Sequence, residues 1–418
     1  MLTVLGNRVY RRLFTAQVVA LLGTGLLTVA LGLLAFDLAG ARAGAVLGTA
    51  LAIKMIAYVG VAPVVNAVVA RMPVKPVLIG ADIVRAAMAL CLPLISEVWQ
   101  VYAVVFVLQA ASATFTPAFQ SVIPAVLPRE RDYTSALSLS RLAYDLEALV
   151  SPALAAVALS VLSYHDLFLG TAGGFVVSAV LVLAAALPAG AAGPGEQGSV
   201  WYRTTQGVRI FWSSPHLRSL LALDLAVAAP TALVLVNTVV YVREVMGRPE
   251  TDLAVALAAF GIGSMVVALC APAALERFGN RLVMLTGAGT IPPVMLATTI
   301  LSFRAGADTG WWALLGLWTL LGAATSAVLT PSARLLRDAA DEATRPYVFT
   351  AQFSLSHACF ILTYPVAGWI GASSGLGWSA AVLTVVAALG AGAAAVSWPR
   401  HPPRAIVVGE DGNREHHD

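Results

Sequence analysis

Long apolar segments dominate this chain and leave very few folds open to it. Of its 418 residues, 59% are hydrophobic and 11% are charged, whereas soluble domains carry about 25% charged residues. A transmembrane helix needs about 20 apolar residues, and lipid offers the backbone no hydrogen-bond partners, so segments of this length must be helical. Twelve segments qualify: 13–38, 44–70, 76–97, 99–124, 136–163, 167–188, 217–242, 252–275, 282–303, 311–334, 347–372 and 376–398. The sequence therefore predicts an all-α membrane protein with twelve transmembrane helices.

Lysine and arginine are distributed unevenly between the two sets of connecting loops. With the N-terminus in the cytoplasm, cytoplasmic segments hold 18 of the 25 Lys and Arg residues, and the outer loops hold only Arg42, Arg243, Arg248 and Arg304. Positive residues accumulate on the cytoplasmic side of a membrane protein. We therefore expect a multi-pass protein of the plasma (inner) membrane with both termini in the cytoplasm.

Local sequence runs recur in the second half of the chain. ThrPro at 116–117 returns at 330–331, and SerLeuSerArg at 138–141 returns as SerLeuSerHis at 354–357. Two parallel halves of six helices place a substrate site between them, near the bilayer midplane. The predicted organisation is two six-helix pseudo-repeats with a linker and a tail: an N-terminal half, a cytoplasmic linker with an interfacial helix, a C-terminal half and a cytoplasmic tail, at 1–188, 189–216, 217–400 and 401–418.

Charged residues inside the apolar segments are the strongest functional signal. At about 1.5 Å per helical residue, Lys54, Asp145, Glu147 and His357 all lie near mid-membrane, where a charge normally faces a partner, a water path or a substrate. Arg141 and Asp145 are spaced i, i+4 and can pair. Glu147 lies about 200° around the helix from Asp145, so it needs another partner, and Lys54 is the candidate.

Two interpretations of this charged set stay open. It is either a group of internal salt bridges that hold helices together, or a transport site in which Glu147 and Asp145 carry protons or bind a cation while Lys54 neutralises the empty site. His357 is either a packing histidine or a metal ligand with those two carboxylates, since imidazole and carboxylate together suit a divalent first-row metal.

Three further intramembrane charges are less informative. Asp224 lies about seven residues into its segment and either lines the inner vestibule or meets a cytoplasmic arginine. Asp82 and Arg85 are spaced i, i+3, so we expect them to pair with each other or with the adjacent loop.

The remaining features exclude several classes of function. Nothing resembles a nucleic-acid-binding patch, a phosphate loop or a catalytic Ser-His-Asp set, and the longest segment outside the predicted membrane core is 189–216. We therefore expect no enzyme and no cofactor. The expected protein is a monomeric secondary transporter that uses an ion gradient, with protons, lipid and a small-molecule or metal-ion substrate as its partners; a substrate sensor on the same scaffold is the alternative.

The loops after the second and eighth segments carry the first family signal. Residues 66–75, AsnAlaValValAlaArgMetProValLys, keep Arg71 and Lys75 of the form Gly-x-x-x-Asp-Arg-x-Gly-Arg-Lys, and a second copy at 272–281 keeps Glu276, Arg277, Gly279 and Arg281. With the two-half layout, the chain resembles the major facilitator superfamily over essentially its whole length. The resemblance implies alternating access, with a gating latch formed by this motif that is weaker in the first copy.

Two other regions resemble particular branches of that family. Residues 116–140 are similar to the signature of enterobactin-exporter-like drug:proton antiporters, and the motif of the fifth segment is recognisable, with Glu147 in place of its middle glycine. The runs 50–59 and 136–147 resemble nickel-resistance exporters. These resemblances imply proton-coupled efflux, with nickel or cobalt as the best substrate guess and an amphipathic organic compound, of the multidrug or siderophore type, as the alternative.

Overall fold

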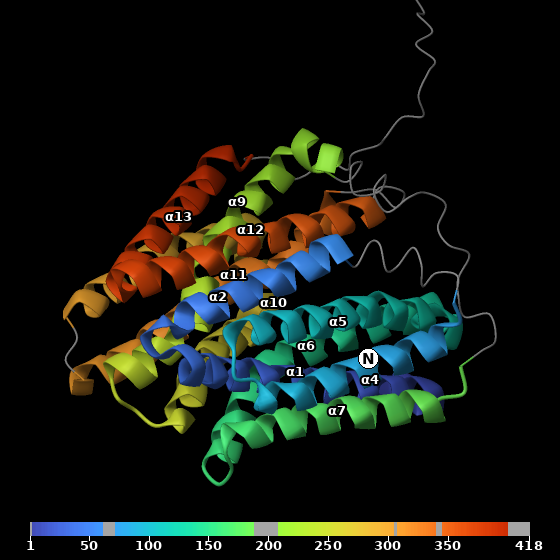
Figure 1. The fold of residues 1–418 in the computed structure, drawn as a ribbon. Helices are drawn as coiled ribbons and strands as arrows, with labels where there is room; N and C mark the ends of the chain where they lie inside the picture. Colours follow the sequence, from blue (N-terminus) through green and yellow to red (C-terminus); the bar gives the residue numbers. More distant parts are fainter. Residues whose placement is uncertain (1, 62–71, 188–207, 305–306, 340–344, 400–418) are drawn as a thin grey trace, which may run out of the picture.

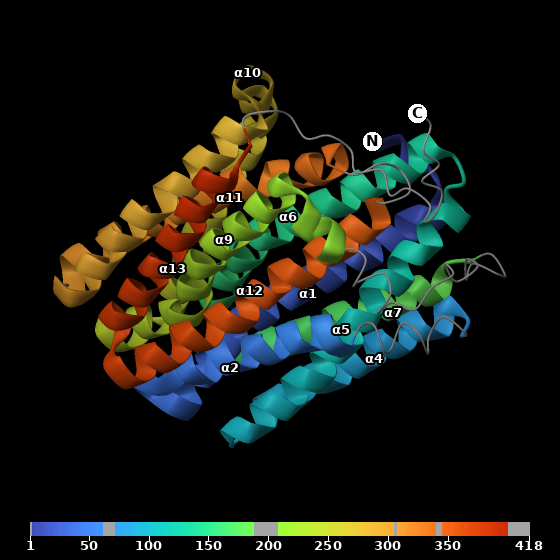
Figure 2. The same cartoon turned by 90° about the horizontal axis from the view of Figure 1, so that it is seen from above.

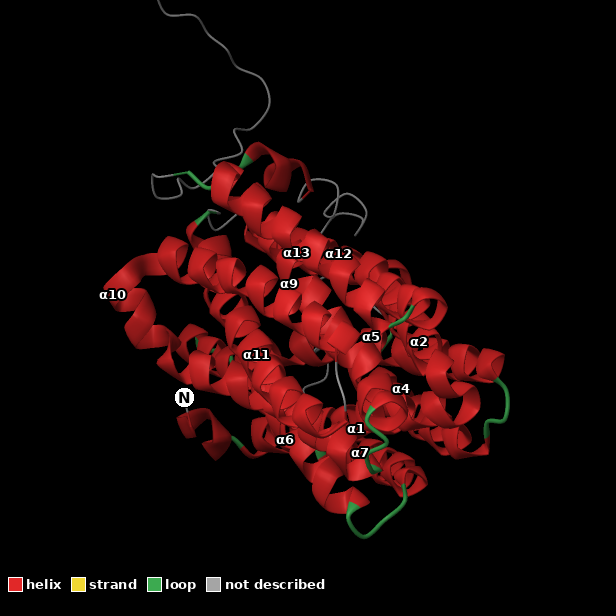
Figure 3. Cartoon of the chain, turned by 90° about the vertical axis from the view of Figure 1, so that its left-hand side faces the viewer, coloured by secondary structure: helices red, strands yellow, loops and turns green. Residues whose placement is uncertain are grey.

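The structure, a computed structural model, describes residues 2–61, 72–187, 208–304, 307–339 and 345–399. Within these ranges the regular structure is entirely helical (Figure 3). The long helices are α1 (Arg8–Ala39), α2 (Ala43–Ile56), α4 (Val74–Cys91), α5 (Val98–Val126), α6 (Glu130–Leu159), α7 (Tyr164–Ala184), α9 (Pro215–Val239), α10 (Glu250–Arg304), α11 (Ala307–Asp338), α12 (Arg345–Ser374) and α13 (Leu376–Ser397). Single π-helical turns, η3 (Ala57–Val61) and η5 (Val240–Val245), continue α2 and α9.

Nine helical stretches in the described part of the chain are long and apolar enough to cross a membrane. Two of them, 8–60 and 250–304, contain 53 and 55 residues, far more than the roughly 20 that one crossing needs. Each is interrupted by a glycine with positive φ, Gly40 (φ 53°) and Gly279 (φ 74°), a backbone conformation that glycine adopts without steric cost. The count of twelve spans in two repeats stays a prediction.

The helix ends differ from the predicted segments where the chain is polar. The apolar pattern predicts a segment that begins at residue 136, but α6 begins at Glu130. The difference arises because hydropathy detects the lipid-buried core of a helix and misses the polar turns that extend beyond it.

The helices pack as two groups whose most extensive contacts with each other are two helix pairs (Figure 1). In the first group α1 packs on α6 and α7, and α4 packs on α5 and α7; in the second, α9 packs on α12 and α13, and α10 packs on α11 and α13. The groups meet where α2 lies beside α12 and where α6 lies beside α10, and the neighbouring paths of α2 and α12 are visible in Figures 1 and 2. We name the two ends of the bundle the Gly40 end and the Gly279 end, after the glycines at which the chain breaks there.

Glycines allow α2 and α12 to approach closely toward the Gly40 end. A Cβ atom added to Gly48 would lie 2.5 Å from the carbonyl oxygen of Tyr364, and one added to Gly368 would overlap the carbonyl oxygen of Gly44. Small residues at such contacts bring helix backbones together in membrane proteins. The two groups are therefore tightly joined at this end.

Other contacts between the groups also lie toward the Gly40 end. Trp369 Nε1 donates a hydrogen bond of 3.0 Å to Thr49 Oγ1, and the Arg243 guanidinium lies 5.5 Å from the centre of the Phe36 ring. At the Gly279 end, the hydrogen bonds between described residues join helices of one group, as when Lys75 Nζ donates to the carbonyl oxygen of Ala185 (2.9 Å). The described contacts thus close the bundle at the Gly40 end.

The linker between the halves is described only from residue 208, so residues 201–207 of the predicted interfacial helix lie outside the described range. Residues 208–213 are helical. Arg209 and Trp212 are exposed, whereas Ile210 and Phe211 are buried. The interfacial helix stays a prediction, and its described part has one apolar and one exposed side.

Asp82 and Arg85 form the buried ion pair that their spacing predicts. Ser178 Oγ on α7 donates a 2.7 Å hydrogen bond to Asp82 Oδ2. The Arg85 guanidinium lies 4.3 Å and 4.5 Å from the ring centres of Phe115 on α5 and Phe175 on α7. Charge, hydrogen bond and ring contacts together tie α4, α5 and α7 into one unit.

We predict that Arg85→Met destabilises the protein strongly, because it leaves the Asp82 carboxylate buried without its cation. Removing one partner of a buried pair costs about 3–5 kcal/mol. Thermal unfolding of the purified protein, followed by fluorescence-detected size exclusion, measures the loss. Arg248→Ala is the control, since the Arg248–Asp252 pair is partly exposed and such pairs contribute only about 0–1 kcal/mol. Equal losses in the two variants would contradict the prediction.

Candidate functional site

Glu147 of α6 faces α1 at Gly25. A Cβ atom added to Gly25 would overlap the side chain of Ser151 and lie 2.9 Å from Glu147 Oε1. Gly25 therefore provides the space in which the Glu147 carboxylate and Ser151 pack against α1. The sequence singles out Glu147, but it does not predict its contact with Gly25, because the two helices are distant in the chain.

Lys54 of α2 is the partner that the sequence predicts for Glu147. The Lys54 ammonium and the Glu147 carboxylate interact electrostatically. Their charged atoms are more than 4.0 Å apart, so the two side chains do not form a direct ion pair. Both side chains are partly buried, and their opposite charges attract each other more strongly there than they would in water.

His357 brings α12, and with it the second group of helices, to the same level. Its Nδ1 lies 2.6 Å from the carbonyl oxygen of Phe353, and a carbonyl oxygen only accepts, so Nδ1 carries the hydrogen and Nε2 of the neutral ring is an acceptor. The Tyr58 ring stacks on the His357 ring with centres 5.8 Å apart. His357 also interacts electrostatically with Lys54. Lys54 is thus within electrostatic range of one titratable residue in each group.

Asp224 of α9 lies in a different environment, nearer the Gly279 end. It is 4% exposed, and Gln352 Nε2 on α12 donates to both of its carboxylate oxygens, at 3.1 Å and 2.9 Å. The sequence leaves open whether Asp224 lines a cavity or pairs with an arginine. Among the described residues, Asp224 does neither. A neutral amide from the neighbouring helix takes that place.

Two predicted site residues are not described at side-chain level. Arg141 and Asp145 belong to α6, but their side chains lie outside the described part of the chain. Among the described residues, no group of three or more His, Cys, Asp or Glu is placed to hold a metal ion. The proposed metal set of His357, Glu147 and Asp145 therefore stays a prediction.

The two copies of the loop motif differ in what the structure describes. In the first copy Lys75 contacts the carbonyl oxygen of Ala185, and Arg71 lies outside the described residues. In the second copy Gly279 forms the break in α10, and its charged residues are all exposed: Glu276, Arg277 and Arg281. The gating role of the motif stays a prediction.

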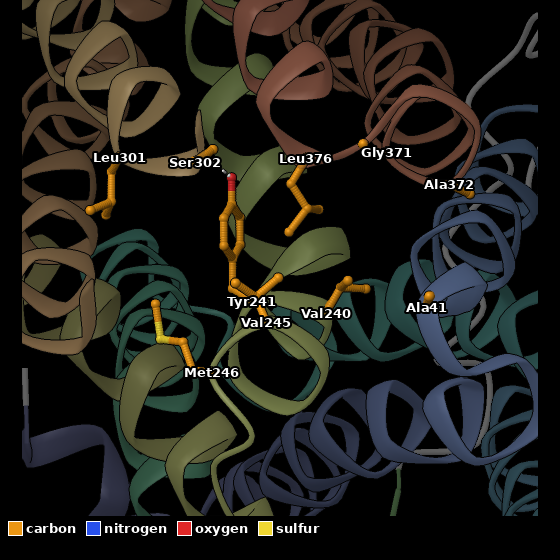
Figure 4. A pocket seen from close by; sticks show the side chains of 11 residues that line it. Ala41, Val240, Tyr241, Val245, Met246, Leu301, Ser302, Gly371, Ala372 and Leu376 are labelled. Carbon is orange, nitrogen blue, oxygen red and sulfur yellow. Dashed lines mark hydrogen bonds between the residues drawn. The ribbon is translucent and has the colours of Figure 1, made fainter. Parts of the chain in front are cut away.

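A pocket of about 350 Å³ lies at the Gly40 end, away from the charged set (Figure 4). Its lining is mainly apolar, with Val240, Met246 and Leu376 among the residues that face it, and its polar feature is the 2.6 Å hydrogen bond between the hydroxyls of Tyr241 and Ser302. Gly371 in its wall is fourteen residues from His357 on α12, which is about 21 Å along a helix. The pocket and the charged set are therefore separate features.

Comparison with known proteins identifies the general architecture. A family model described as Major Facilitator Superfamily matches residues 13–291 and 233–414. The chain is similar to Macrolide efflux protein A of Enterococcus faecalis, 28% identical over 152 residues, and to its namesake in Streptococcus pyogenes, 28% identical over 148 residues. Each match covers 34% of this chain, and the two matches span 47% and 36% of those relatives.

Solved structures match almost the whole chain. The nucleoside transporter NupG aligns with a TM-score of 0.70 and 14% identity, over 93% of this chain and 98% of that one. A D-xylose-proton symporter aligns at 0.71 and 12% identity, over 95% and 98%. An inward-facing bacterial homologue of the lysosomal transporter Spinster aligns at 0.71 and 13% identity, over 93% and 96%. At this level of identity, the likeness shows the fold alone.

We predict that Gly25→Ala destabilises the contact between α1 and α6, because the new methyl group overlaps Ser151. Overpacking of this kind costs about 1–3 kcal/mol. Thermal unfolding measures the loss, and the double variant Gly25→Ala with Ser151→Gly should recover most of it. Gly80→Ala on α4 is the control, because a Cβ atom there meets nothing within 4 Å. A Gly25→Ala protein as stable as the control would contradict this packing.

Proposed function

The chain belongs to the major facilitator superfamily, and from this we propose that it is a secondary transporter that exports a small organic cation in exchange for protons by alternating access. The observation that carries the proposal is the electrostatic interaction of Glu147 with Lys54, on helices of the first group, where the sequence predicts the middle of the membrane. The proposal includes twelve spans in two halves, 1–188 and 217–400, a cell-membrane location, a monomer and cytoplasmic termini.

Charge balance at Glu147 explains how protons and substrate would exclude each other. With Glu147 ionised, it and Lys54 sum to zero charge, and a cationic substrate group can approach the carboxylate. With Glu147 protonated, Lys54 leaves a net positive charge that repels such a group, strongly so in a medium of low dielectric constant. Proton binding from one side would therefore drive substrate release.

Lys54 also connects this event to the other half of the protein. It interacts with Glu147 on α6 and with His357 on α12. A change of charge at Glu147 alters the net charge of Glu147 and Lys54 together, and with it the electrostatic force that the pair exerts on groups of α12. This supports coupling between protonation and the relative movement of α2 and α12.

Asp224 is a candidate for a second proton site. Its described partner is the amide of Gln352, which carries no positive charge to offset a buried carboxylate, and an uncompensated buried charge is costly. Binding a proton would neutralise the carboxylate and leave an oxygen to accept from Gln352. Each half would then hold one proton-binding carboxylate, Glu147 in the first and Asp224 in the second.

An organic substrate fits this site better than a divalent metal ion. The positive charge of Lys54 opposes a doubly charged ion at Glu147, and the described residues include no cluster of metal ligands. The chain is similar over about a third of its length to macrolide efflux proteins, which favours export of an organic compound. Nickel or cobalt remains the second candidate because it rests on His357 and Glu147 together with Asp145.

We predict that Glu147→Gln abolishes proton-driven transport and weakens substrate exchange, because the neutral amide leaves the charge of Lys54 uncompensated, as protonation does. The amide keeps the shape that packs against Gly25 and removes the proton-binding group. In proteoliposomes with an imposed pH gradient, uphill transport should fall to the level of empty liposomes, and counterflow without a gradient should fall as well. Glu244→Gln, which alters an exposed carboxylate at the Gly40 end, should leave both unchanged.

The same assay separates the candidate substrates. Erythromycin, ethidium, Ni²⁺ and Co²⁺ are offered in parallel, and we expect uphill movement of an organic compound. Movement of the metal ions alone would favour the second candidate. Full uphill transport by Glu147→Gln would remove Glu147 from the coupling mechanism.

We predict that Asp224→Asn lowers the number of protons exchanged per substrate by one, because it removes the proton site of the second half and retains a hydrogen-bond partner for Gln352. The reversal potential of substrate flux in proteoliposomes reports this ratio. Gln352→Leu should keep the ratio of the wild type. An unchanged ratio in Asp224→Asn would contradict a proton site at Asp224.

A further inference from the structure

Helix α12 carries five aromatic side chains on one face. They follow one another at intervals of four, four, three and four residues: Phe349, Phe353, His357, Phe360 and Tyr364. At 3.6 residues per turn this spacing confines them to an arc of about 80°. We name this set the aromatic stripe of α12.

The middle of the stripe meets the first group of helices through Tyr58. The Phe353 and His357 rings lie 4.1 Å apart. The Tyr58 ring, in the π-helical turn η3, lies 6.2 Å from Phe353 and 5.8 Å from His357. Because Tyr58 belongs to the other group, Phe353 faces the contact between the two groups.

Exposure along the stripe changes from one end of the bundle to the other. Tyr364, next to Gly48 at the closed Gly40 end, is 4% exposed, whereas Phe353 is 43% and Phe349 is 40% exposed. In a membrane-spanning helix an exposed ring faces either lipid or the space between the two groups, and the contact of Phe353 with Tyr58 places Phe353 at the contact between the groups. The rings toward the Gly279 end are therefore partly uncovered there, whereas the Gly40 end is closed.

Two carboxylates are connected to the stripe through neighbouring residues. Asp224 binds Gln352, which directly precedes Phe353 on α12. Glu147 interacts with Lys54, which is within electrostatic range of His357. An exposed aromatic face attracts organic cations through the ring quadrupole, and a carboxylate within reach of the same molecule would add the attraction of opposite charge.

We propose that Phe353 and Tyr58 form the recognition site for a planar, ring-bearing organic cation, whose ring stacks on Phe353 while its charged group approaches Glu147. This inference rests on the proposed function and specifies its substrate class. Offset stacking between rings and contact between a cation and a ring both stabilise such a complex. An inorganic cation has no ring to stack and gains only the second of these contacts.

Ethidium binding to the purified full-length protein in lipid nanodiscs tests the proposal. Phe353→Leu removes the ring and keeps an apolar side chain, so we expect the dissociation constant, measured by fluorescence anisotropy, to rise about tenfold, the order of effect of a desolvated cation–ring contact. Phe353→Trp keeps a ring and should bind as tightly as the wild type. Phe106→Leu is the matched control, because Phe106 on α5 is similarly exposed, at 41%, and lies outside the stripe.

Three results would overturn the proposal. Unchanged ethidium binding by Phe353→Leu would remove Phe353 from recognition. Equal weakening in Phe353→Leu and Phe106→Leu would assign the effect to lipid-exposed phenylalanines in general. A wild-type protein that transports erythromycin but does not bind ethidium would exclude this substrate class. In that last case the proposed export function stands, whereas absence of any proton-driven transport by the wild type would refute the proposed function itself.

Discussion

The cost of placing charge in a membrane-embedded bundle governs where this protein puts its acidic residues. Asp82, Glu147 and Asp224 each lie where one helix meets another, and each has a partner close by: Arg85, Lys54 and Gln352 respectively. The hydrogen bond from Ser178 to Asp82 joins α7 to α4, and that from Gln352 to Asp224 joins α12 to α9. Residues that compensate a buried carboxylate therefore also specify which helices are neighbours. The arrangement of the helices and the positions of the buried polar groups therefore depend on each other.

The three carboxylates differ in how completely their charge is compensated, and this difference separates support from function. Asp82 has a cation, a hydroxyl and a surrounding of aromatic rings, all within one helix group. Glu147 has a cation that is near but not in direct contact, and Asp224 has a neutral amide. A buried carboxylate with a cation in direct contact gains less from binding a proton than one without such a contact. This ordering favours Glu147 and Asp224 as proton carriers and Asp82 as a structural residue.

The sequence predicts the features of the fold and of the candidate site that depend on local geometry, but not those that depend on how distant helices dock. Apolar length predicts the helices, and spacing along one helix predicts the Asp82–Arg85 pair, because both depend on local geometry. The approach of Lys54 to Glu147 follows from depth in the membrane. The contact of Asp224 with Gln352, and the need for glycine at position 25, depend on how distant helices dock, which no local pattern encodes. The aromatic stripe was a local signal that helical periodicity could have revealed, since its spacing is visible in residues 349–364.

Helix α12 links the closed end of the bundle to the charged centre. It carries Gly368 and Tyr364 in the close contact with α2, His357 near Lys54, and Gln352 on Asp224. The contact of α12 with α2 is made through glycines at Gly48 and Gly368 and, farther from the Gly40 end, with η3 through the rings of Tyr58, Phe353 and His357. If the halves rock about the level of Lys54, separating Tyr364 from Gly48 must bring the opposite ends of these helices together. The rings that are free in this state would then be covered, and a molecule stacked on Phe353 would face the Gly40 end. Recognition and release would thus follow from the same movement of one helix against another.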